Sequence, residues 1–164
     1  MTAQLAAQGH RLARHRVEVA EHPWLARATA YCLDAIDGIV EAPHAYELMF
    51  VLRFLDAAAE RVPQAQQLMH RLARYVGRDG PTPVVGGADG EVLHLVDFTA
   101  YAGTRLRATF PSDAVAADLE RLAQEQRPDG GWTVTYASYS PAAALEWRGY
   151  ATVQAVALLR GATL

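Results

Sequence analysis

The stretch PHAYELMFVLRFLDAAAERVPQAQQLMHRLARYV, residues 43–76, decides the fold class. It holds two segments of helical length, and a proline precedes each of them, at Pro43 and Pro63. Proline is favoured at the first position of a helix because its missing N–H is not needed there. Residues 46–59 are apolar almost all round, whereas residues 64–76 are apolar on one face only. We therefore predict two helices over 44–59 and 64–76, the first buried on all sides and the second half-exposed.

The same alternation extends to either side of this stretch. Pro23 lies twenty residues before Pro43 and begins another amphipathic segment. Ser140-Pro141 is a further helix start, with Ser140 as the candidate N-cap. Alternating buried and half-exposed helices predict an inner set of helices wrapped by an outer set. The helices predicted outside residues 43–76 are 4–20, 24–37, 113–126 (amphipathic) and 150–159 (apolar all round).

Two stretches depart from the helical pattern. Residues 84–96 hold two short β-type runs around a glycine-rich loop, which predicts a small hairpin. Residues 132–136 alternate large apolar side chains with threonine, which predicts a short strand. The glycine-rich segment 86–90 is interpreted as a turn, because no helix and no Lys-Ser/Thr pair follows it as in a phosphate-binding loop.

Composition excludes several classes of protein. A chain of 164 residues is expected to be a single domain over 1–164, and 51% apolar against 20% charged residues excludes a disordered one. No run is long and apolar enough for a transmembrane segment, and no secretory signal is recognised, so we expect a cytoplasmic protein. A net charge of −3 argues against nucleic acid as a partner. Because Cys32 is the single cysteine, we expect no internal disulfide and no multi-cysteine metal site. We assign no other metal site and expect no cofactor.

The segment LAQEQRPDGGW, residues 122–132, has the spacing L-x₃-Q-x₃-G-x-W. It resembles the QW repeat of squalene-hopene cyclases, oxidosqualene cyclases and protein prenyltransferase β-subunits, and the chain looks like a largely uncharacterised bacterial branch of that family. In that motif the glutamine amide binds open backbone groups at a helix end, and the tryptophan ring folds back over it. The residues that match the motif are Gln126, Gly130, Gly131 and Trp132.

The resemblance implies an all-α fold, a two-layer α/α toroid of helical hairpins with short β-hairpin excursions. This chain has about half the helices of a full α6/α6 barrel, so a homodimer or a partner domain is expected to complete the ring. It also implies a terpene-cyclase or prenyltransferase-like domain that handles a hydrophobic, isoprenoid-type ligand and is not a complete catalyst alone. The alternative is a non-catalytic helical module for binding or dimerisation.

Whether the chain is an enzyme is left open by its polar residues. The D-x-D-D acid motif of class II cyclases and the D-D-x-x-D motif of class I enzymes are both absent. Glu91, His94 and Asp97 form the most suggestive polar set, since a histidine beside a carboxylate suits proton transfer. Asp97, flanked by apolar residues, is the candidate acid, with His94 beside it; the alternative is that they only stabilise a loop or cap the next segment.

Aromatic residues concentrate late in the chain. Their ring faces could stabilise carbocations in a ligand cavity, and the alternative is simple packing of a loop against helices. The candidate cavity residues are Tyr136, Tyr139, Trp147 and Tyr150. The histidines other than His94 share no ligand spacing and are interpreted as surface or cap residues: His10, His15, His22, His44 and His70.

Overall fold

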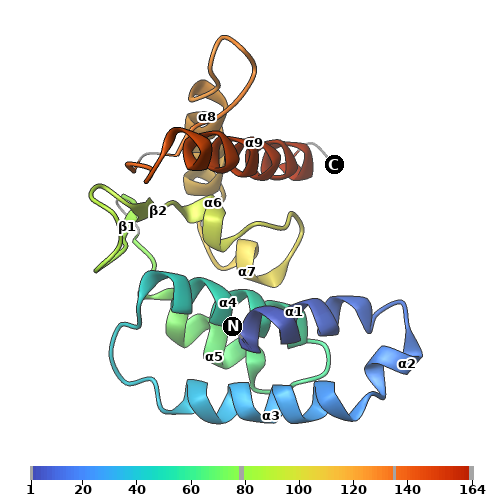
Figure 1. The fold of residues 1–164 in the computed structure, drawn as a ribbon. Helices are drawn as coiled ribbons and strands as arrows, with labels where there is room; N and C mark the ends of the chain where they lie inside the picture. The colour runs from blue at the N-terminus through green and yellow to red at the C-terminus, as the bar shows by residue number, and fades with distance from the viewer. Residues whose placement is uncertain (1, 78–79, 135, 163–164) are drawn as a thin grey trace. The chain divides into compact units, whose positions relative to one another are not determined.

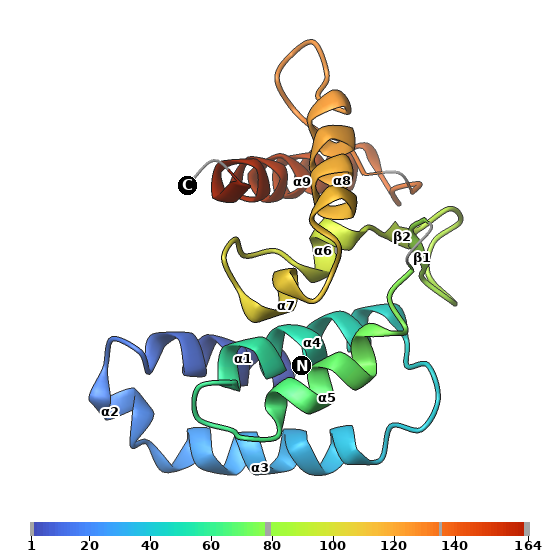
Figure 2. The same cartoon turned by 180° about the vertical axis from the view of Figure 1, so that it is seen from behind.

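The computed structural model describes residues 2–77, 80–134 and 136–162. Within these residues the chain forms nine helices and one two-stranded sheet, which confirms the all-α prediction (Figures 1 and 2). The chain divides into two compact units, Met1–Gly77 and Arg78–Leu164, which we call the N-terminal and C-terminal units. The toroid arrangement and the single domain over 1–164 stay predictions.

The N-terminal unit is built around one buried helix. It comprises α1 (Thr2–Leu12), α2 (Val17–Ala20), α3 (Pro23–Asp37), α4 (Ala45–Ala58) and α5 (Ala65–Ala73). Helix α4 packs against both α1 and α5, while α3 packs against α1. The side chains of α4 are buried around most of its circumference, among them Leu48, Leu52, Phe54 and Leu55, as its apolar sequence predicts.

The helix starts of this unit are set by histidine as well as by proline. Pro23 is the first residue of α3, and the Nδ1 of His22 accepts the N–H of Trp24 at 3.2 Å. His44 caps α4 in the same way, with Nδ1 accepting the Tyr46 N–H at 3.3 Å. Pro43 and Pro63 precede their helices as predicted, but each lies before the N-cap residue and not at the first helical position that proline favours.

The single helix predicted over 4–20 is also wrong, since the chain forms α1 and α2 with a turn at 13–15 between them. Arg16 is extended, with φ −136° and ψ 106°. The physical reason is tertiary: α3 packs against α1, so the chain has to reverse between the two helices.

The C-terminal unit begins with a hairpin and ends with the longest helix of the described chain. It comprises β1 (Thr82–Pro83), β2 (Val92–Leu93), α6 (Leu95–Phe98), α7 (Arg105–Ala108), α8 (Ser112–Gln124) and α9 (Pro141–Ala162). Helix α8 packs against both α6 and α9. The strands pair antiparallel, Thr82 with Leu93 and Pro83 with Val92, so a hairpin is present as predicted, but its first strand lies before the predicted range of 84–96. Its loop turns at two glycines with positive φ, Gly86 (77°) and Gly90 (76°).

Two predictions for this unit are wrong. Residues 132–134 and 136 form no strand, and the remaining residue of that predicted strand, 135, lies outside the described residues. The backbone N–H of Trp132 instead donates a hydrogen bond to Thr152 Oγ1 on α9 at 3.0 Å, where a strand would have donated it to a neighbouring strand.

The segment 150–159 is not buried on all sides. It is part of α9, which starts at Pro141 with Ser140 Oγ accepting the Ala143 N–H at 3.2 Å, as predicted. Tyr150 and Val153 are 57% and 68% exposed, because α9 packs on one side only, through residues such as Ala155 and Leu158. None of the described helices combines the length and apolar character that a membrane crossing requires.

Candidate functional site

The predicted acid, Asp97, lies at the start of α6, where it caps the helix. Its Oδ2 accepts the backbone N–H of His94 at 2.7 Å, and His94 is the N-cap residue of α6. The third helical residue thus reaches back to the N-cap, as in a capping box. In the structure His94 and Asp97 therefore cap the start of α6, which is the alternative to a role in proton transfer.

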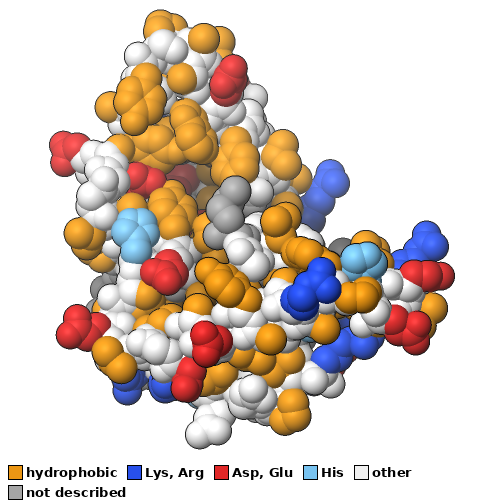
Figure 3. Space-filling view, turned by 60° about the horizontal axis from the view of Figure 1, so that its bottom comes forward, with side chains coloured by type: hydrophobic (Ala, Val, Ile, Leu, Met, Phe, Trp, Pro, Cys, Tyr) orange, Lys and Arg blue, Asp and Glu red, His pale blue; other side chains and the backbone are white. Residues whose placement is uncertain are grey.

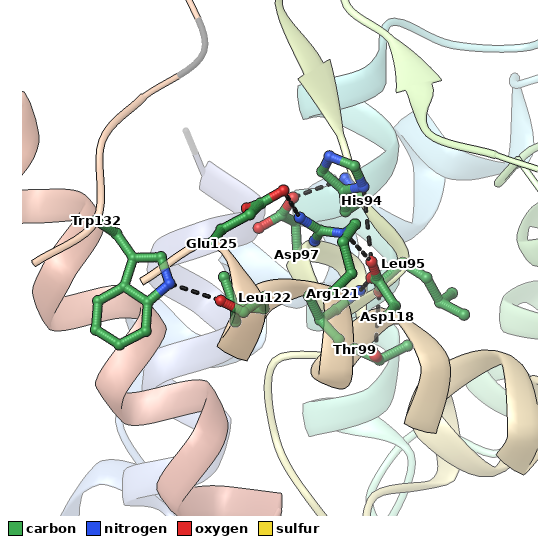
Figure 4. Close-up of polar contacts among 10 residues, drawn as sticks. His94, Leu95, Asp97, Thr99, Asp118, Arg121, Leu122, Glu125 and Trp132 are labelled. Atoms are coloured by element: carbon green, nitrogen blue, oxygen red, sulfur yellow. Dashed lines mark hydrogen bonds and ion pairs between the residues drawn. The ribbon is translucent and has the colours of Figure 1, made fainter. Parts of the chain in front are cut away.

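Asp118 on α8 is the centre of this site, and sequence reasoning missed it. Its Oδ2 accepts the N–H of Val96, the second residue of α6, at 2.8 Å. Its Oδ1 accepts from Arg121 Nε at 2.6 Å and lies 3.6 Å from His94 Nδ1 (Figure 4). The Asp118 side chain is only 11% exposed, so these contacts replace most of its water. One carboxylate therefore holds the start of α6 against α8.

Arg121 completes the charge balance around Asp118. Its NH1 group donates to Glu125 Oε1 at 2.7 Å, one turn further along α8. Burial opposes its charge, but the hydrogen bonds to Glu125 and Asp118 outweigh burial, and the pKa of the guanidinium is raised. Both oxygens of Asp118 are thus occupied by donors, which suits a structural carboxylate better than a proton acceptor.

Glu91, the third member of the predicted polar set, lies in the hairpin. Its Oε2 accepts the Ala88 N–H at 2.8 Å and closes the glycine-rich turn. Among the described residues, no group of three His, Cys, Asp or Glu side chains is placed to hold a metal ion.

The residues that match the QW spacing form a clamp between α8 and α9. Trp132 is buried, and its indole N–H donates to the carbonyl of Leu122 on α8 at 2.7 Å (Figure 4). The Gln126 amide donates to the Gly130 carbonyl at 2.9 Å, and Gly130 has a φ of 85°. Since Trp132 also binds Thr152 through its backbone, one residue joins the end of α8 to the middle of α9.

An ion pair reinforces the clamp. Asp129 accepts from the Gly131 N–H at 3.2 Å and from Arg148 on α9, which lowers the pKa of its carboxyl, the Arg148 bond contributing most. A side chain at Gly131 would collide with Arg148, whose NH2 group would lie 2.8 Å from the added Cβ. An added side chain at this glycine would therefore require the flexible Arg148 guanidinium to shift.

Three of the four candidate cavity aromatics form one cluster. Trp147 lies edge-on to Tyr136 at 5.7 Å between ring centroids and to Tyr150 at 5.8 Å. Burial, followed by the negative charges of the Glu91 carboxylate and the ionised Tyr150 hydroxyl, raises the pKa of Tyr136. Trp147 and Tyr150 remain exposed at the surface, and Tyr139 is fully exposed outside the cluster.

Two hollows in the described chain are lined by other residues than these aromatics. A groove of about 640 Å³ in the N-terminal unit lies between α3 and α5, bounded by residues such as Leu33, Asp37 and Arg71. A shallow hollow of about 400 Å³ lies over the clamp, between Gly131 and Arg148.

A buried histidine in the N-terminal unit was missed. His10 was interpreted as a surface or cap residue, but it lies in the core against Phe54, at 5.8 Å between ring centroids. The Thr29 hydroxyl donates to the Leu25 carbonyl at 2.7 Å, so His10 Nε2 must donate to Thr29 Oγ1 at 2.8 Å. His10 Nδ1 is then a buried acceptor without a hydrogen-bond partner in the described chain. Burial, then the charges of Arg61 and Arg14, lower the pKa of this imidazole.

The sequence held a signal for this position. Ala6, Ala7, His10 and Ala13 recur at helical spacing, and all four are buried.

No protein-family model matches the chain, and no curated protein or solved structure shows significant similarity to it.

Proposed function

We propose that this chain is a helical module that handles a hydrophobic, isoprenoid-type ligand and carries no complete catalytic set of its own. The observation that carries the proposal is the cluster of Tyr136, Trp147 and Tyr150, whose rings meet edge to face while Trp147 stays 39% exposed. Such rings offer a branched hydrocarbon both apolar surface and a negative π-face for any positive charge on it.

Surface hydrophobicity agrees with an apolar ligand. Leu145, Tyr150 and Val153 are exposed along α9, beside Trp147. Figure 3 shows one face of the molecule, on which hydrophobic side chains form patches between the charged groups. Exposed apolar side chains such as those of α9 are found at sites that receive a ligand or a partner.

The polar residues support a role without catalysis. Asp97 caps α6, and Asp118 is saturated by the Val96 N–H and Arg121. A general acid has to deliver a proton to a bound ligand, whereas the oxygens of these carboxylates already accept hydrogen bonds from within the chain.

The two-layer half-toroid belongs to the same proposal. It is supported by the buried helix α4, which packs against the amphipathic helices α1 and α5, and by the clamp of Gln126 and Trp132 between α8 and α9. A second chain or domain would then supply the missing half of the ring.

A binding titration tests the proposal. Farnesol, a linear isoprenoid alcohol, is titrated into a Trp24→Phe background, where the emission comes from Trp132 and Trp147. We expect saturable quenching with a Kd of about 10 μM or below, and at least about tenfold weaker binding in Trp147→Ala. Tyr139→Ala is the matched control, because Tyr139 lies outside the cluster, and should bind like the parent.

Two outcomes would refute this function. Absence of saturable binding, or equal binding by Trp147→Ala and the parent, would exclude the aromatic cluster as the ligand site. Product formation from linear isoprenoids that disappears in Asp97→Asn would instead establish a catalyst with Asp97 as its acid.

A further inference from the structure

The exposed face of α9 has a regular composition along the helix. Glu146, Tyr150, Val153, Ala157 and Arg160 follow one another at intervals of four, three, four and three residues, and all are exposed. This spacing places them on a single face. The side of α9 that is packed carries different residues, including the buried Ala155 and Leu158.

We propose that this face pairs with the same face of a second copy of the chain, with the two α9 helices antiparallel and Val153 at the two-fold axis. The centre of the face is apolar, since Tyr150 and Val153 are more than half exposed, and the charges lie only at its two ends. A helix face of this kind gains free energy when it is covered by another apolar face.

The placement of the charges selects a second copy as the occupant. Glu146 comes seven residues before Val153, and Arg160 comes seven residues after it. At 1.5 Å per residue each charge lies about 10 Å from the axis, so in an antiparallel pair each Glu146 faces Arg160 of the second copy. A parallel pair would place Glu146 against Glu146, which is repulsive. The face is therefore complementary to itself in one orientation only, as an isologous dimer requires.

Side-chain size fits the same arrangement. Tyr150 lies three residues before the axis and Ala157 four residues after it, so the large ring of one copy meets the small side chain of the other. Gly149, next to Tyr150, adds no bulk to the approach. Arg160 has an interaction within its own chain, and its guanidinium, with five N–H donors, can also bind the carboxylate of the second copy.

This inference goes beyond the proposed function and needs no ligand. Tyr150 belongs to both the aromatic cluster and the pairing face, so self-association is measured in ligand-free buffer. Failure of the pairing then leaves the farnesol titration unaffected, and failure of that titration leaves the pairing unaffected.

Sedimentation equilibrium of the full chain over a concentration series tests the pairing. We expect a monomer–dimer equilibrium for the parent and a Kd raised at least about tenfold in Glu146→Arg and in Arg160→Glu, since each change turns two attractive pairs into repulsive ones. The double variant restores both pairs, and its Kd should return to within about threefold of the parent. Val153→Arg should be monomeric, while its control Val40→Arg, an exposed valine of the N-terminal unit, should dimerise like the parent.

Three results would overturn the inference. They are a monomeric parent at every concentration, single charge variants that dimerise like the parent, and a double variant that stays as weak as the single ones. Far-UV circular dichroism of each variant checks that it folds. If Val153→Arg fails to fold, the single and double variants of Glu146 and Arg160 still test the pairing.

Discussion

Replacing Asp118 with alanine is expected to destabilise the C-terminal unit by about 2–3 kcal/mol. The largest part comes from the Val96 N–H, whose 2.8 Å bond to Asp118 is lost, and an unpaired N–H of this kind costs about 1–3 kcal/mol. Arg121 retains Glu125 as a partner, so the loss of its bond to Asp118 adds up to about 1 kcal/mol. The His94 contact, at 3.6 Å, is too long for a hydrogen bond and adds nothing to this sum.

Urea unfolding in the Trp24→Phe background measures this loss. The remaining tryptophans, Trp132 and Trp147, both lie in the C-terminal unit, so their emission follows the unit that holds Asp118. Glu125→Ala is the matched control, because it removes the other partner of Arg121 at a half-exposed position. We expect the control to lose less than about 0.5 kcal/mol.

The asparagine variant separates the two contacts of Asp118. In Asp118→Asn the amide oxygen can still accept the Val96 N–H, while its NH₂ group opposes the Nε–H of Arg121, so we expect an intermediate loss of about 1 kcal/mol. Equal stability of Asp118→Ala and Glu125→Ala would refute the reasoning that this carboxylate holds α6 against α8.

Three further predictions concern other contacts. Burial lowers the pKa of His10 in the folded state, so the unfolded chain binds a proton at this residue first as the pH falls. The free energy of unfolding should therefore decrease as the pH drops below about 6.5. In urea titrations, His10→Gln should lack this part of the pH dependence. Trp132→Phe leaves the Leu122 carbonyl without its indole donor and should cost about 1–2 kcal/mol by the same fluorescence assay, read from Trp147. His22→Ala removes the acceptor for the Trp24 N–H and should lower the free energy of unfolding, measured by thermal denaturation, by about 0.5–2 kcal/mol. His15 is exposed, so His15→Ala should be as stable as the parent.

The helices could be predicted where the local pattern was strong. The proline that begins α3, the buried character of α4 and the Ser140-Pro141 start of α9 were all visible in the sequence. The break between α1 and α2 was not, because residues 13–16 carry no proline and the chain reverses there only to pack α3 on α1.

Of the candidate site, only the contact between residues close in sequence could be predicted. The spacing of His94 and Asp97 suggested a cap as one of two interpretations, and the cap is formed through neighbouring atoms. Asp118 lies on another helix, and nothing in its local sequence distinguishes it from the other acidic residues of α8. The exposed flank of α9 was mistaken for a buried surface, because apolar composition does not tell which sides a neighbour covers.

The sequence by itself determined the elements whose information is local: helix periodicity, the caps at His22, His44 and Ser140, and the glycine turn of the hairpin. These depend on contacts between residues a few positions apart, which the backbone geometry of each element enforces. Only the tertiary structure decided that Asp118 serves α6, that Trp132 reaches Leu122, and that His10 is buried against Phe54. Such contacts depend on which apolar faces meet, and burial is a property of the whole packed unit, which no single segment encodes.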